Sequence, residues 1–146
     1  MSLGEYLAAQ KFRRVSLSRT GVGHLEVAGT LNGHQVRILI DTGAASTVAS
    51  LMRVHELGFQ VEPLARCGAG AGGARLQVFR VDGAELRLGD IVPKVEALLA
   101  LDLTHVNAAL AQKGVAPVDV VLGVDVLDAH AAIIDYGSAS LFLREP

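Results

Sequence analysis

What this sequence lacks narrows its class before any motif is read. It holds one cysteine, Cys67, which excludes a disulfide scaffold. It has no tryptophan, only 4% aromatic residues, and no apolar run near the roughly 20 residues that a membrane helix needs. With 13 basic and 15 acidic residues, it has no basic excess of the kind that binds nucleic acid. We therefore expect a cytoplasmic chain, in a reducing compartment, with neither nucleic acid nor a membrane as partner.

The apolar content is high enough for a packed core. Hydrophobic residues make up 51% of the 146 residues. This excludes intrinsic disorder, because disordered chains lack the apolar surface that offsets chain entropy. The length fits about one domain. We expect an N-terminal extension over residues 1–12 and a single domain over residues 13–146.

Two dipeptides predict β-hairpins, because both of their residues tolerate the positive φ of a tight turn between apolar strands. A shorter strand is expected at about 13–18, before the first of these two hairpins. The predicted hairpins are Asn32-Gly33 between strands at about 23–31 and 34–40, and Asp82-Gly83 between strands at about 75–82 and 84–89.

The rest of the chain reads as short strands with a few short helices. Strands do not alternate with long helices along the chain. This disfavours a doubly wound α/β sheet and favours a single β-barrel or sandwich. The glycine-rich residues 68–73 fit neither a helix nor a strand. The predicted helices are 50–57 ended by Gly58, 102–114 capped by Asp102 and ended by Gly114, and 125–129; the further strands are 59–64, 118–121, 131–135 and 141–144.

The sharpest chemical signal is an aspartate at the end of an aliphatic strand. Residues 38–44 read ILIDTGA, so the strand delivers the carboxylate of Asp41 directly into a tight turn. Thr42 offers a hydroxyl, and Gly43 lets another backbone come close. Taken alone, an Asp-Thr-Gly tripeptide is typical of an ordinary turn.

The flanks of this turn resemble a known family. Residues 32–48, NGHQVRILIDTGAASTV, resemble the active-site segment of retropepsin-like aspartic proteases, and residues 120–127, VVLGVDVL, resemble that family's hydrophobic-hydrophobic-Gly element. Residues 131–136 and 141–143 resemble the strand pair that closes the family's domain, so the resemblance covers about residues 22–144. It implies an all-β fold, the retropepsin-like acid-protease closed barrel with two or three short helices.

The resemblance implies an aspartic endopeptidase in which two carboxylates share one proton across a water molecule. One carboxylate deprotonates the water, and the other protonates the carbonyl oxygen of the peptide. This sequence holds a single Asp-Thr-Gly motif. The pair is therefore expected to form from the catalytic Asp41 of two chains, related by a two-fold axis. The partners implied are a peptide or protein substrate and a second copy of the chain, and neither a cofactor nor a metal is implied.

The resemblance also assigns supporting roles around the catalytic aspartate. Thr42 matches the threonine that hydrogen-bonds across the family's dimer and fixes the dyad. Gly43 matches the position of close approach, and Ala44 completes the motif. Leu122 and Gly123 match the residues that pack under the catalytic turn, where a side chain larger than hydrogen at position 123 would clash.

A glycine-rich segment falls where the family has the flap that covers its substrate. Glycine lets such a lid flex and lie close to a peptide backbone. The flap is expected at Gly68, Gly70, Gly72 and Gly73. The alternative is an exposed glycine-rich loop with no role in the site.

The chain departs from the family's pattern in two places. Ala45 stands where relatives often carry Ser or Asp, and the helical insert at about 102–114 is longer than viral members need. Asp125 and Asp135 match recurrent acidic positions of relatives, but we interpret them as a helix cap and a turn former. The lone Cys67 is interpreted as an incidental small residue.

Other functions explain less of the sequence. Asp119, Asp125, Asp128 and His130 lie close in sequence, but their spacing matches no ligand motif, so no metal site is predicted. A non-hydrolytic peptide-binding or dimerisation module on the same fold is the main alternative, since fold does not fix function. A small lipid- or ligand-binding β-barrel would leave Asp41 without a role.

Overall fold

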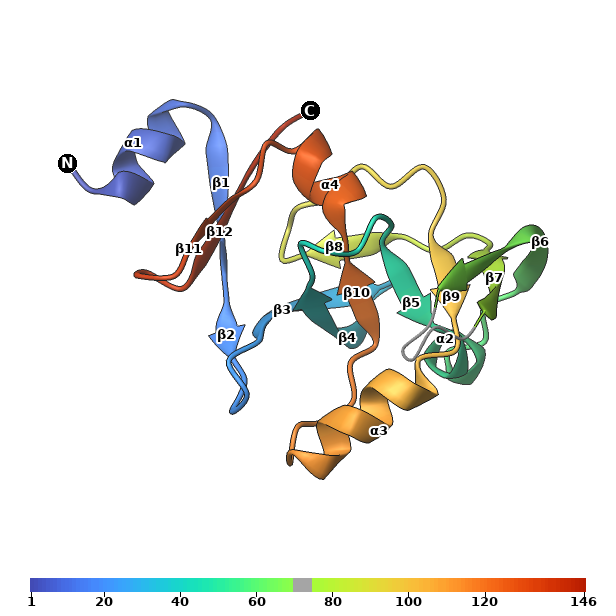
Figure 1. Ribbon diagram of the computed structural model, residues 1–146. Coiled ribbons are helices and arrows are strands. Elements are labelled where there is room, and N and C mark those ends of the chain that lie inside the picture. The colour runs from blue at the N-terminus through green and yellow to red at the C-terminus, as the bar shows by residue number, and fades with distance from the viewer. Residues whose placement is uncertain (70–74) are drawn as a thin grey trace.

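The computed structural model describes residues 1–69 and 75–146, with the backbone alone for residues 66–69. Short strands dominate this part of the chain, and the few helices are short (Figure 1). The mostly β composition predicted from the sequence is therefore confirmed. The helices are α1 (Leu3–Ala9), α2 (Leu51–Glu56), α3 (Thr104–Gln112) and α4 (Val124–Ala129).

The strands fall into two sheets, one small and one large. Their bounds are β1 (Phe12–Ser16), β2 (Ser18–Arg19), β3 (Leu25–Leu31), β4 (His34–Ile40), β5 (Val48–Ser50), β6 (Val61–Ala69), β7 (Arg75–Val81), β8 (Leu86–Leu88), β9 (Leu99–Leu101), β10 (Val120–Leu122), β11 (Ile133–Asp135) and β12 (Ser140–Arg144).

The large sheet is an open path of strands among the described residues. Its order is β2-β3-β4-β10-β5-β9-β7-β6, with β8 attached to β3. The small sheet, β1-β12-β11, joins strands from the two ends of the chain and lies to one side of the large sheet (Figure 1). The expected closed barrel is not confirmed, because no pairing within the described part of the chain joins β2 to β6.

The first predicted hairpin is confirmed, and the second is wrong. β3 and β4 pair antiparallel, and Asn32 and Gly33 between them both have positive φ, at 46° and 84°. β7 instead pairs with β6 and β9, while β8 pairs with β3. The side chain of Asn32 donates to the carbonyl of Gly83 and accepts from the backbone N–H of Glu85. These two bonds hold the second turn against the first and direct β8 onto β3.

Two groups of apolar side chains fill the interior. The larger one lies between the strands of the large sheet and α4, and Leu31, Ile38 and Leu122 in it are fully buried. The smaller one lies under α3, where it contains Leu110 and Val121. The helical insert is therefore anchored by a core of its own.

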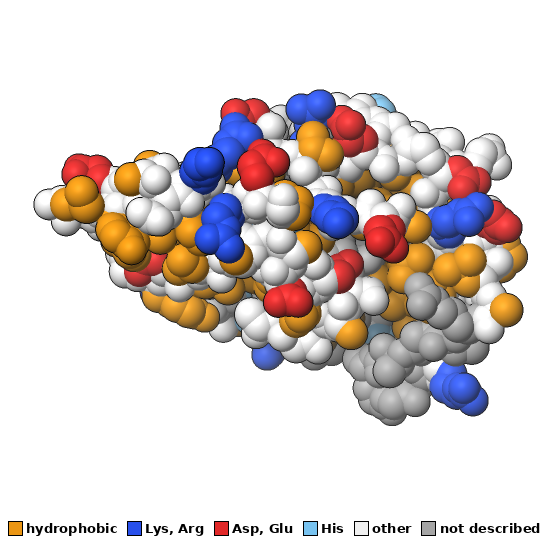
Figure 2. All heavy atoms as spheres, turned by 90° about the horizontal axis from the view of Figure 1, so that it is seen from above, with side chains coloured by type: hydrophobic (Ala, Val, Ile, Leu, Met, Phe, Trp, Pro, Cys, Tyr) orange, Lys and Arg blue, Asp and Glu red, His pale blue; other side chains and the backbone are white. Residues whose placement is uncertain are grey.

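The N-terminal residues include a helix that the sequence patterns did not predict. The hydroxyl of Ser2 accepts a hydrogen bond from the N–H of Glu5 and caps α1, and Leu7 is buried. Leu3 and Tyr6 are half exposed, and Figure 2 shows apolar side chains gathered at this end of the molecule. Over the rest of that face, acidic and basic side chains are mixed. None of the helices in the described residues has the length and apolar character needed to cross a membrane.

Candidate active site

Asp41 lies where the central strand β4 ends. β4 is held between β3 and β10, and β10 runs parallel to it. The backbone N–H of Asp41 donates to the carbonyl of Leu122, at 3.0 Å, so the end of β10 fixes the start of the turn. The carboxylate is partly exposed, and its Oδ1 accepts from the N–H of Gly43 at 2.9 Å. The rigid interior of the sheet thus presents a carboxylate at its surface.

One side of the turn packs against the chain's own second motif, residues 120–127. We call this the inner side; it is formed by Thr47, Leu122, Gly123 and Asp125. The N–H of Val124 donates to the carbonyl of Ala44 at 2.7 Å. A Cβ added at Gly123 would lie 2.7 Å from the carbonyl oxygen of Ala44 and 2.8 Å from that of Ser46. Both are backbone atoms, which a side chain cannot displace without moving the turn. The structure therefore places Leu122 and Gly123 beneath the turn.

Thr47 links the turn to Asp125 on the inner side. Its hydroxyl is buried, with the residue 1% exposed, and accepts from the N–H of Gly123 at 3.0 Å. The same hydroxyl donates to Asp125 Oδ1 at 2.7 Å, and the N–H of Thr47 donates to Asp125 Oδ2 at 3.0 Å. The interpretation of Asp125 as a helix cap is wrong, because its carboxylate holds Thr47 and Gly123 is the residue at the start of α4. Local sequence patterns predict neither the bond between Asp125 and Thr47 nor the place of Gly123 at the start of α4.

The opposite side of the turn, called the outer side below, carries the residues that follow Asp41. Thr42, Gly43 and Ala45 are exposed, and Ala44 is half buried. A Cβ at Gly43 would approach Asp41 Oδ1 to 3.3 Å, so any larger residue would crowd the carboxylate. The outer side therefore leaves a hydroxyl and an open backbone beside the acid.

The predicted flap lies only in part within the described residues. Gly70, Gly72 and Gly73 lie outside the described residues. The backbone of Gly68 belongs to β6 and pairs with Leu76 of β7, so the strand extends further than the sequence predicted. β6 and β7 form an antiparallel pair on either side of the glycine-rich segment.

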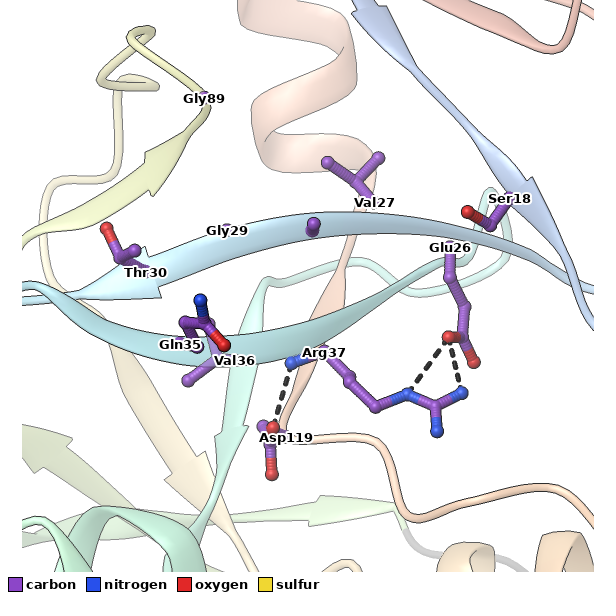
Figure 3. Close-up of a pocket in the computed structure, with 11 residues that line it drawn as sticks. Ser18, Glu26, Val27, Gly29, Thr30, Gln35, Val36, Arg37, Gly89 and Asp119 are labelled. Atoms are coloured by element: carbon purple, nitrogen blue, oxygen red, sulfur yellow. Dashed lines mark hydrogen bonds and ion pairs between the residues drawn. The ribbon is translucent and has the colours of Figure 1, made fainter.

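A polar cluster that the sequence did not predict lies on β3 and β4. Glu26 is 8% exposed, and its Oε1 accepts from Nε and Nη2 of Arg37, at 3.1 and 2.6 Å (Figure 3). The N–H of Arg37 donates to Asp119 Oδ2 at 2.8 Å, and the N–H of Asp119 donates to the carbonyl of Arg37 at 2.9 Å. These groups line a shallow cavity of about 560 Å³. The cluster fixes the chain just before β10 enters the sheet.

The acidic residues near the C-terminus do not meet. Asp119 and Asp125 bond to Arg37 and Thr47, respectively. His130 is buried, accepts from the N–H of Lys94 at Nε2 and contacts the carbonyl of Arg144 through Nδ1. Within the part of the chain that the structure describes, no group of three or more His, Cys, Asp or Glu side chains is placed to hold a metal ion.

Two carboxylates outside the Asp41 turn have pKa values below their ordinary value. Hydrogen bonds from the hydroxyl and N–H of Thr104 lower the pKa of Asp102 at the start of the insert. A hydrogen bond from the hydroxyl of Ser138 lowers the pKa of Asp135, which forms a turn as expected. A lowered pKa means that the ionised form favours the folded state. Each contribution is present above the ordinary value of 3.8 and is lost as the pH falls through the lowered pKa.

Comparisons with known proteins agree with this geometry. Residues 27–126, more than half of the chain, match the model of a family described as aspartyl protease. No curated protein matches the chain.

Solved structures with a similar fold include three proteases or protease-like domains. The retroviral protease-like domain of Ddi1 from Leishmania major is 18% identical, with a TM-score of 0.56 over 82% of this chain and 87% of that one. A retropepsin-like aspartic protease from Rickettsia conorii is 16% identical, with a TM-score of 0.54 over 90% of both chains. The EIAV protease complexed with the inhibitor HBY-793 is 19% identical, with a TM-score of 0.53 over 76% of this chain and 91% of that one. At these identities the likeness shows a shared fold.

Proposed function

Because the chain belongs to the aspartyl protease family and has a retropepsin-like fold, we propose that it hydrolyses peptide bonds with a dyad of two Asp41 carboxylates, one from each of two copies. The family makes the chain an aspartic-type endopeptidase. The shared dyad and the chemistry below belong to the proposal.

The observation that carries the proposal is the asymmetry of the single Asp-Thr-Gly turn. Its inner side is packed and hydrogen-bonded by the chain's own second motif. On its outer side, Thr42 and Gly43 are exposed next to the Asp41 carboxylate. A second copy placed on a two-fold axis there would bring the same carboxylate alongside. The two Asp41 carboxylates would then form a complete dyad without any change in the conformation of the turn.

The proposed chemistry needs only these groups and a water molecule. Two carboxylates that lie close together cannot both ionise readily, so they hold one proton between them and titrate as a unit. The ionised one removes a proton from the water as it attacks the peptide carbonyl. The protonated one gives its proton to the carbonyl oxygen. Thr42 would fix the pair by hydrogen-bonding across the axis, and Gly43 would let the two turns approach.

The flap assignment of Gly68, Gly70, Gly72 and Gly73 is part of the same proposal. It rests on the resemblance and on the antiparallel pairing of β6 and β7, the strands on either side of the segment. A cover of this kind would exclude water from the bound peptide and complete the site.

A cleavage assay tests the proposal. A denatured protein substrate is incubated with the purified chain from acid to neutral pH, with and without a pepstatin-type inhibitor and a metal chelator. We expect cleavage that the inhibitor abolishes and the chelator does not affect. Cleavage that the chelator abolishes would contradict the proposal, and binding of peptides without cleavage at any pH would favour a non-hydrolytic module on this fold.

A further inference from the structure

An apolar row crosses the sheet next to the Asp41 turn. Leu39 of β4 is the register partner of Val121 of β10, and Val121 is in turn the partner of Val48 of β5. Leu39 lies two residues before Asp41, so the alternation of side chains along a strand places both on the same side of the sheet. A peptide held at Asp41 would therefore lay a side chain onto this row.

The apolar side chains of the helical insert belong to the same cluster as this row. The cluster around it combines buried residues under the insert with half-buried residues that stay open to solvent. The buried members are Leu103, Leu110, Val115, Val118 and Val121, and the half-buried ones are Val22, Leu39, Ala44, Val48, Leu101 and Val106. Because Ala44 belongs to the Asp-Thr-Gly-Ala turn, the cluster under the insert reaches the proposed catalytic turn itself.

The insert is fixed in this position by polar contacts between α3 and the segment that follows it. The side chain of Asn107 donates to the carbonyl of Val118 at 3.2 Å and accepts from the N–H of Val118 at 2.9 Å. The next residue, Asp119, is held by the backbone of Arg37, and Figure 3 shows this contact beside the cavity on β3 and β4. A segment held at this point keeps one shape, so it can act as a fixed wall.

We propose that α3 is the wall of a substrate side-chain pocket and that Val106 sets the size of the apolar side chain accepted beside the scissile bond. The proposal rests on the proposed function, because the cluster to which Val106 belongs reaches the Asp41 turn through Ala44. Leu110 is buried as an anchor, whereas Val106 is the half-buried apolar residue that α3 contributes to the open part of the cluster. A change of its volume alters the pocket with little effect on the core.

The experiment uses a series of peptides that differ only in the residue before the scissile bond, which is Ala, Val, Leu or Phe. Values of kcat/KM are measured for the wild-type chain, Val106→Ala and Val106→Phe. Dissociation constants of the same, uncut peptides are measured with Asp41→Asn added to each chain. Ala108→Val is the matched control, because Ala108 is exposed and lies two residues on, at the opposite side of the helix.

Val106→Ala is expected to raise the preference for Phe over Val by about 10-fold or more, since single methylenes in such pockets carry effects of that size. Val106→Phe should shift the preference toward Ala, and Ala108→Val should leave it unchanged. Unchanged ratios in both Val106 variants, with unfolding temperatures near that of the wild type, would overturn the proposal, as would a series that does not bind. If no peptide is cut but the binding ratios shift as expected, the wall is supported and the hydrolytic function fails.

Discussion

The two sides of the Asp41 turn are built in opposite ways. On the inner side, the hydroxyl of Thr47 is buried and shared between Gly123 and Asp125, and there is no room for a Cβ at position 123. On the outer side, Thr42 is exposed, although it carries the same hydroxyl. The chain therefore fixes the position of its own carboxylate and leaves open the face where a second carboxylate would have to arrive. The proposed dyad of two Asp41 carboxylates requires such a division, because the open face would meet its own copy across a two-fold axis.

The largest effect is expected for the carboxylate between the two sides. Asp41→Asn keeps the shape of the side chain but removes the general base from both halves of the proposed dyad. Cleavage should fall to background, because general acid–base catalysis alone contributes roughly 10²–10⁴-fold. The unfolding temperature should stay at or slightly above that of the wild type, because no contact of the core is lost. Cleavage by purified, folded Asp41→Asn protein would refute the assignment.

Overpacking should break the inner side. Gly123→Val places a side chain against the backbone of Ala44 and Ser46, and overpacking of this kind typically costs about 1–3 kcal/mol of unfolding free energy. Activity should fall further than stability, because the displaced backbone is the turn itself. Denaturant unfolding and kcat/KM measure the two effects. Gly21→Val is the control, since Gly21 has open space around it, and equal losses in the two variants would show that position 123 is not special.

Removal of the Thr47 hydroxyl tests the inner side of the turn more finely. Thr47→Val keeps the volume but leaves the buried N–H of Gly123 without its acceptor, which costs roughly 1–3 kcal/mol. It also releases the carboxylate of Asp125. Denaturant unfolding should show the loss directly. A stability equal to that of the wild type would mean that this network does not hold the turn.

A threonine-to-valine substitution on the outer side should weaken the association of two chains instead of the stability of one. Thr42→Val changes an exposed residue, so the unfolding free energy of the single chain should move by less than about 0.5 kcal/mol. The protein concentration needed for half-maximal activity should rise, because the proposed bond across the two-fold axis is lost. Activity assays over a dilution series and sedimentation measure this. An unchanged concentration dependence would show that Thr42 makes no contact with a second copy.

The sequence predicted the hairpin that leads into the Asp41 turn better than the hydrogen bonds on the inner side of the turn. Asn32-Gly33 and the apolar strand before Asp41 are local sequence signals, and the β3–β4 hairpin forms where they predict it. The bond between Thr47 and Asp125 joins residues 78 positions apart, and no spacing rule connects them. Local chemistry suggested a helix cap for Asp125, but tertiary contact gave the carboxylate another partner.

The second hairpin was predicted wrongly for the same reason. Asp82-Gly83 does form a turn, with Gly83 at a φ of 68°, but the pairing of β8 with β3 is decided by Asn32 on another hairpin. The insert was predicted as a helix capped by Asp102 and ended by Gly114. The end is confirmed, with Gly114 at a φ of 73°, but the residue at the start of α3 is Leu103, and Asp102 lies one residue earlier and accepts from the N–H of Thr104. Its contact with the row beside Asp41 also involves β4 and β5, which are distant from α3 in sequence.

The most direct test of the account is whether one active site needs one Asp41 or two. Wild-type and Asp41→Asn chains are mixed at fixed total concentration, unfolded, refolded together and assayed for cleavage. If each site takes one carboxylate from each of two copies, activity should follow the square of the wild-type fraction, so an equal mixture should keep about a quarter of it. Activity that falls in simple proportion to the wild-type fraction would mean that each chain works alone, and it would contradict the shared dyad.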